Sequence, residues 1–133
     1  MTEVPTVPQG VLLQNLVVDA RGREGGYRIH DDGRFERRSV GGEWQEAPTL
    51  APAQVTAVRT AIGDAGLSRL EPRYEPAAAP ADDGGSTLHV HARVDGAVRH
   101  VAVVRPCRVA EVDALVTRVD AILKEARQRE QAR

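Results

Sequence analysis

Three of the four histidines fall within one short stretch of the chain, at His89, His91 and His100. Apolar and polar residues alternate on both sides of an Asp-Gly pair at 95–96. This pattern is typical of a β-hairpin with a two-residue type I′ turn, in which both turn residues need a positive φ. Because the turn sets the register, we predict a hairpin over residues 86–104 with the three imidazoles on one face and His91 directly opposite His100.

Three neutral imidazoles and a water molecule form a ligand set that suits zinc, nickel or copper. Side chains directly opposite each other in an antiparallel pair have Cβ atoms roughly 5 Å apart, so His91 and His100 could bind one ion together. Two facing imidazoles also repel each other when both are charged, which would lower the pKa of each. No carboxylate or cysteine completes the set within this stretch. We therefore expect no cofactor and an exposed, solvated histidine face, with zinc or another transition metal on His89, His91 and His100 as the alternative.

The other residues with chemical potential do not form a catalytic set. Cys107 follows Pro106 at the start of a predicted helix, where amide dipoles would stabilise a thiolate, but a nucleophilic cysteine needs a positioned base and none is evident. The acidic pairs at 31–32 and 82–83 each precede a glycine, which is typical of turns. The chain carries no phosphate-binding glycine loop, nucleophile elbow or paired zinc cysteines. We predict no catalytic residue and no enzymatic activity.

Composition excludes further classes of function. The 133 residues carry a net charge of -1, whereas a general nucleic-acid binder needs a surplus of basic side chains. Hydrophobic residues make up 41% of the chain, but no run approaches the roughly 18 apolar residues of a membrane span. The N-terminus lacks a basic segment followed by an apolar one, so no signal peptide is expected. We predict no nucleic-acid partner, no membrane association and a cytoplasmic location.

Strand patterns extend beyond the histidine hairpin. Val11–Val18 is rich in β-branched residues and leucine and is typical of a strand. A second hairpin is expected over residues 27–38, after a turn over residues 20–26. A three-residue loop with Gly33 in the left-handed conformation would pair Ile29 with Phe35.

Two helices are predicted over Pro52–Ala65 and Pro106–Arg127, because apolar residues recur there at spacings of three and four. Residues 1–10 are expected to be a disordered lead-in and residues 126–133 a charged helix tail, on either side of a single domain over residues 11–125. The predicted fold class is α+β. An antiparallel sheet of four to five strands, in β-β-β-α-β-β-α order, would carry both helices on one face.

Several short motifs carry a family resemblance; they are Gly25-Gly26-Tyr27, Asp32-Gly33, Ala51–Gln54, Gly66-Leu67 and Leu115–Leu123. The chain resembles a group of small bacterial α+β domains and is similar in outline to the emfourin-type protein inhibitors of thermolysin-like metalloproteases. The resemblance implies a binding domain that acts on a protein partner through its loops and without catalysis.

The predicted contact surface combines two glycine-containing segments. One is the turn that ends in Gly25 and Gly26, with Tyr27 beside it. The other is the loop over residues 77–85, which includes Asp82, Asp83 and Gly84. If both segments lie at one end of the sheet, they would meet the partner together.

Overall fold

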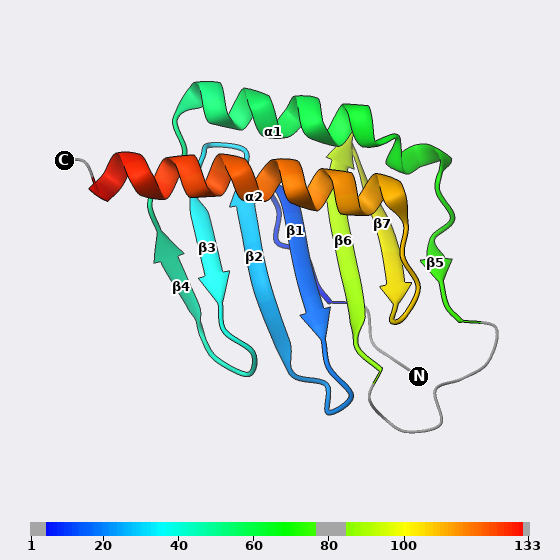
Figure 1. Ribbon diagram of the computed structural model, residues 1–133. Helices are drawn as coiled ribbons and strands as arrows, with labels where there is room; N and C mark the ends of the chain where they lie inside the picture. Colours follow the sequence, from blue (N-terminus) through cyan, green and yellow to red (C-terminus); the bar gives the residue numbers. More distant parts are fainter. Residues whose placement is uncertain (1–4, 77–84, 132–133) are drawn as a thin grey trace.

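The computed structural model describes residues 5–76 and 85–131, which form one sheet with two helices on one of its faces (Figure 1). The first half of the described chain contains β1 (Val11–Val18), β2 (Glu24–His30), β3 (Phe35–Arg38), β4 (Trp44–Ala47) and α1 (Pro52–Ala65). The second half contains the short helix η1 (Leu67–Arg69), β5 (Arg73–Tyr74), β6 (Thr87–Val94), β7 (Ala97–Val104) and α2 (Ala110–Gln131). The α+β class is confirmed.

The sheet is larger than predicted. Within the described residues it has seven strands in the order β4-β3-β2-β1-β6-β7-β5, rather than four to five. It is mixed rather than purely antiparallel, because the two-residue strand β5 pairs with β7 in parallel. A strand of two residues is too short to show alternation, and its partner lies far along the chain, so no local pattern marks it.

The registers of both predicted hairpins are confirmed. In the β6–β7 hairpin Val94 pairs with Ala97 and His91 pairs with His100, with Asp95 at φ 51° and the following glycine at φ 80°. In the β2–β3 hairpin Ile29 pairs with Phe35. In both cases the turn residues favour one loop geometry, which then fixes every pair along the strands.

The main core lies between the sheet and the helices. Apolar residues of α1 and α2, which include Val58, Leu115 and Val119, pack on the helix-facing side of the central strands. The strands contribute Leu13, Ile29, Val90 and Val101 to this core. Helix α1 has the predicted bounds and ends at Gly66 in the left-handed conformation. Helix α2 starts at Ala110, four residues later than predicted, and continues to Gln131. Among the described residues, no helix has both the length and the apolar composition that a membrane span requires.

Helix α2 crosses the sheet from β7 to β4 and has two different flanks (Figure 1). On one flank Arg118 donates to Asp64 of α1 at 2.9 Å, and Arg129 donates to Gln54 of α1 at 3.3 Å. The opposite flank carries Asp113, Asp120, Lys124 and Arg127, which recur at spacings of seven, four and three and therefore lie on one side of the helix. This flank, which we call the free flank of α2, faces away from α1.

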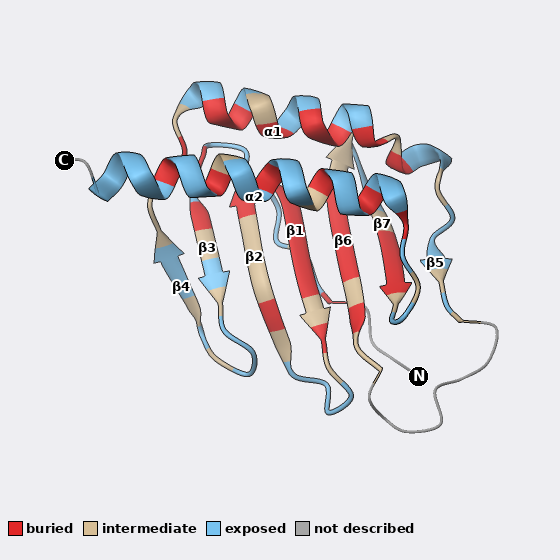
Figure 2. Cartoon of the chain, viewed as in Figure 1, coloured by how far each residue is buried: buried red, intermediate tan, exposed pale blue. Residues whose placement is uncertain are grey.

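The second face of the sheet is not the solvated surface that the sequence predicts. His89 is 1% exposed and His91 is 5% exposed, and Gln14 beside them is fully buried. Figure 2 shows β1 and β6 buried along most of their length, as expected for strands covered on both faces. Part of this cover is the segment 5–10, in which Pro5 is buried and the carbonyl of Thr6 accepts a 3.0 Å hydrogen bond from Gln14 Nε2.

Candidate functional site

Gly25 and Gly26 do not form the predicted turn, because they lie inside strand β2. Gly26 pairs with Leu16 of β1, and a Cβ atom at this position would overlap the carbonyl oxygen of Asn15. Gly25 is covered by Val40, whose backbone nitrogen would lie 2.9 Å from an added Cβ. The two glycines therefore permit close backbone approach within the sheet rather than a reversal of the chain.

Tyr27 lies on the helix-facing side of β2. Its hydroxyl oxygen accepts a 3.3 Å hydrogen bond from Asn15 Nδ2, and burial raises the pKa of this phenol. Its ring meets Phe35 edge-on, with centroids 5.9 Å apart. The other predicted contact residues, Asp82, Asp83 and Gly84, lie outside the described residues.

The three histidines come together as predicted, but as a hydrogen-bonded and stacked cluster. His89 Nδ1 and His100 Nε2 are 2.8 Å apart and share a hydrogen bond. The two ring planes differ by 7° and the centroids are 5.1 Å apart, so the rings lie edge to edge in nearly one plane. His91 stacks on His100 with centroids 4.3 Å apart and planes at 17°. We call these three residues the histidine cluster.

The cluster favours neutral imidazoles. Burial lowers the pKa of His89 and of His91 to about 4, and the neighbouring His100 adds to both shifts. Burial followed by the charge of Arg73 also lowers the pKa of His100. Buried imidazoles without a facing carboxylate resist protonation because the charged form loses its hydration.

The same geometry does not direct three lone pairs at one point. The lone pairs of imidazole lie in the ring plane, and the three planes are nearly parallel. One nitrogen of His89 and one of His100 are already committed to each other. Within residues 5–76 and 85–131, no group of three His, Cys, Asp or Glu side chains is arranged to hold a metal ion. A metal site on His89, His91 and His100 would require the rings to rotate.

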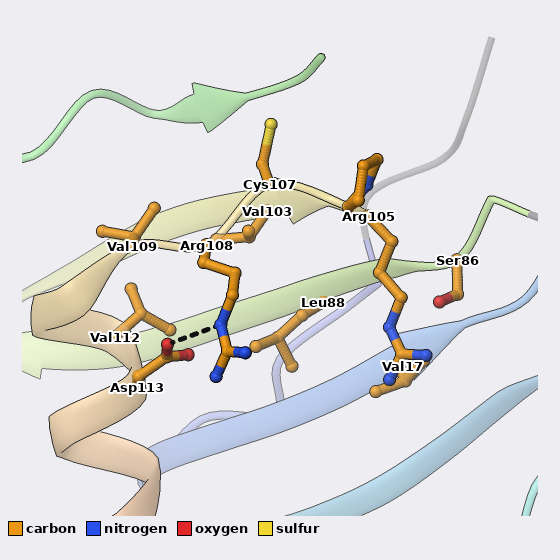
Figure 3. Close-up of a pocket in the computed structure, with 11 residues that line it drawn as sticks. Val17, Ser86, Leu88, Val103, Arg105, Cys107, Arg108, Val109, Val112 and Asp113 are labelled. Carbon is orange, nitrogen blue, oxygen red and sulfur yellow. Dashed lines mark hydrogen bonds and ion pairs between the residues drawn. The ribbon is translucent and has the colours of Figure 1, made fainter. Parts of the chain in front are cut away.

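A cavity of about 400 Å³ lies where β7 leads into α2 (Figure 3). Its floor is aliphatic and comes from three neighbouring strands, the first turn of α2 and the residue before it; the floor residues are Val17, Leu88, Val103, Val109 and Val112. Arg105, Arg108, Ser86 and Asp113 surround this floor. We call it the first cavity.

The polar groups of the first cavity differ in how they are paired. Arg108 Nε donates to Asp113 at 3.3 Å, whereas Arg105 has no ion-pair partner among the described residues. Figure 3 shows the Arg105 side chain passing Ser86 toward Val17, with the Cys107 thiol pointing away from Leu88. Cys107 lies in the turn before α2, not at the predicted helix start. The first cavity therefore presents a guanidinium above an apolar floor, and no activated thiol.

A second cavity of about 390 Å³ opens farther along α2. The strands contribute Tyr27, Phe35 and Arg37, and the helix contributes Asp120, Leu123, Lys124 and Arg127. Burial raises the pKa of Asp120, and the charge of Arg127 opposes this shift. Arg37, Lys124 and Arg127 form no ion pair within the described part of the chain.

Both cavities lie on the free flank of α2, since Asp113 lines the first and Asp120, Lys124 and Arg127 line the second. Of the predicted contact residues that the structure describes, Tyr27 lines the second cavity, and Gly25 and Gly26 line neither. The sequence analysis did not identify Arg105, Arg108, Lys124 or Arg127, although the spacing of charges along residues 113–127 marks one side of a helix. Comparisons of the chain with protein-family models, with curated proteins and with solved structures found no match.

Proposed function

We propose that this protein is a non-enzymatic binding domain whose partner is another protein. The observation that carries the proposal is the pair of open cavities on the free flank of α2. Each has an apolar lining and at least one basic side chain without an ion-pair partner among the described residues; these side chains are Arg105 in the first cavity and Arg37, Lys124 and Arg127 in the second. Apolar clefts with a few convergent polar groups are the usual sites of recognition. Within the described residues, no hydrogen bond joins the thiol of Cys107 or the carboxylates of Asp113 and Asp120 to a base or a nucleophile, which supports binding without catalysis.

The first partner to test is a thermolysin-like metalloprotease, the class that the sequence resemblance suggests. We expect stoichiometric inhibition when the protein is titrated into a peptidase assay, and we expect inhibition to survive surplus zinc. Inhibition that disappears with zinc would indicate removal of the metal from the enzyme, not a protein interface. No inhibition in either condition would reject this partner class.

Two charge-reversal variants test whether the second cavity belongs to the binding surface. Lys124→Glu places a negative charge in the second cavity, whereas Arg59→Glu makes the same change on the exposed surface of α1. We expect the first variant to weaken inhibition about tenfold and the second to leave it unchanged, because nearby charges mainly affect a complementary surface. Equal effects of the two variants would place the interface elsewhere.

The alternative function is metal binding by His89, His91 and His100, which is supported by the convergence of the three rings in one cluster. Binding of zinc to the folded protein would raise its melting temperature. The test compares the zinc response of the parent protein with that of His91→Ala. A rise that is lost in the variant would support the alternative, and equal responses would reject it.

A further inference from the structure

Basic side chains gather along the free flank of α2 although the chain as a whole has a net charge of -1. The first cavity contributes Arg105 and Arg108, and the second contributes Arg37, Lys124 and Arg127. Among the described residues that line the two cavities, the carboxylates are Asp113 and Asp120. Glu46 and Glu130 line a neighbouring cavity with Arg37 and Arg127. Asp113 is already paired with Arg108. The flank therefore carries a local positive excess, which favours an anionic partner.

The lining under these charges is apolar in both cavities. The first cavity is floored by valine and leucine side chains, and the second by Tyr27, Phe35 and Leu123. Volumes of about 400 and 390 Å³ accommodate one or two side chains each. A ligand that fills both cavities must therefore offer an apolar group and a negative charge at two separate places.

Helix geometry gives the separation of the two places. Asp113 marks the first cavity and Lys124 marks the second. At about 1.5 Å per residue, these two positions are roughly 16 Å apart along the helix axis. An extended chain advances about 3.3 Å per residue, so about five residues of peptide cover this distance.

We propose that the free flank of α2 binds an extended acidic segment of the partner protein, which places an aliphatic side chain and a neighbouring carboxylate in each cavity. The two aliphatic–acidic pairs are about five residues apart in the partner. This inference rests on the proposed function, because it gives the chemistry of the partner at the same surface. A small anion alone would leave the apolar floors exposed, and an uncharged apolar peptide would leave the cations without partners.

The test uses a synthetic peptide and needs no natural partner. The probe is the acetylated and amidated heptapeptide LEGSGLE, titrated into the isotopically labelled protein and followed by NMR. We expect amide shifts at both Val109 and Lys124, which line the first and second cavities. The peptide LQGSGLQ lacks both charges and should bind about three- to tenfold more weakly, in line with the loss of two solvent-exposed ion pairs.

A second comparison tests the spacing between the two aliphatic–acidic pairs, and a third tests where the peptide binds on the protein. LEGLE has the same end groups with a spacer that is too short, so we expect shifts at one cavity at a time and weaker binding. Lys124→Glu should reduce affinity for LEGSGLE, and Arg59→Glu should leave it unchanged. Equal binding of the charged and uncharged peptides, or shifts confined to another surface, would overturn the inference. If the protein inhibits the protease but does not bind the peptide, the inference of an acidic segment is wrong and the proposed binding function stands. If it binds the peptide but does not inhibit the protease, the thermolysin-like protease alone is rejected as the partner.

Discussion

Replacing Gly26 by alanine should lower the free energy of unfolding by about 3 kcal/mol or more, which is large for a change of one methyl group. Gly26 has a φ of 153°, and its Cα faces the carbonyl of Asn15 in the neighbouring strand. The oxygen cannot move without disturbing the pairing of β1 with β2 at the centre of the sheet. Denaturant unfolding followed by the fluorescence of Trp44, the single tryptophan, measures the change.

Gly63→Ala is the matched control for this substitution. Gly63 lies on the exposed side of α1, where an added Cβ meets no atom within 4 Å. Alanine has a higher helix propensity, so this variant should gain up to about 1 kcal/mol. Parental stability of Gly26→Ala would contradict the described β1–β2 pairing. Loss of partner binding in a Gly26 variant would be explained by damage to the sheet, because Gly26 lies within the β1–β2 pair and lines neither cavity.

Acidification from pH 7 to pH 5 should destabilise the protein by about 2 kcal/mol for each of the two most buried histidines. In the unfolded chain the imidazoles titrate near 6.5, whereas in the folded protein burial lowers the pKa of His89 and His91 to about 4. Between pH 4 and pH 6.5 the unfolded chain binds more protons than the folded protein does, so a fall in pH favours unfolding. The free energy of unfolding that depends on these histidines is therefore highest above pH 6.5, falls as the pH drops and levels off below pH 4.

Unfolding curves at pH 7, 6 and 5 measure this dependence in a range where carboxyl groups of ordinary pKa remain ionised. His91→Phe keeps a ring to stack on His100 and removes one titrating group, so its stability should fall less steeply over the same range. His91→Asn serves the same purpose if the larger ring is not accommodated. Parallel curves for the parent and a folded variant would show that the cluster does not control acid stability.

The sequence predicts local features of this fold well because short-range chemistry determines them. The turn residues Asp95, Gly96 and Gly33 each favour a positive φ, and the registers that follow from these turns are confirmed. Helix α1 is bounded by Pro52 at its start and Gly66 after its end, and both signals act within one turn of helix.

Long-range features of the fold are harder to predict from the sequence. The pairing of β1 with β6 and the parallel pairing of β5 with β7 join distant parts of the chain, and strand periodicity contains no information about the identity of the partner strand. Glycine is ambiguous for a related reason. Gly25 and Gly26 are as compatible with a turn as with a strand, and only the backbone packed against them distinguishes the two.

The candidate site also combines features that local sequence determines with features that depend on long-range packing. The shared face of His89, His91 and His100 follows from the turn at 95–96, but the burial of that face depends on what covers it. The positions of Asp120, Lys124 and Arg127 on one flank of α2 follow from helical spacing. Arg105 lies in the turn before α2, and both cavities depend on where the helix crosses the sheet.

The central place of β1 in the sheet has a consequence for synthesis of the chain. Strand β1 can pair with β2 as soon as both are made. Its other edge has no partner until β6, which follows helix α1 in the chain, is made. Until then Val11–Val18, an apolar segment with an open row of backbone donors and acceptors, is exposed on the growing chain. Such edges recruit other strands, so we expect slow translation before β6 to promote aggregation of the nascent chain.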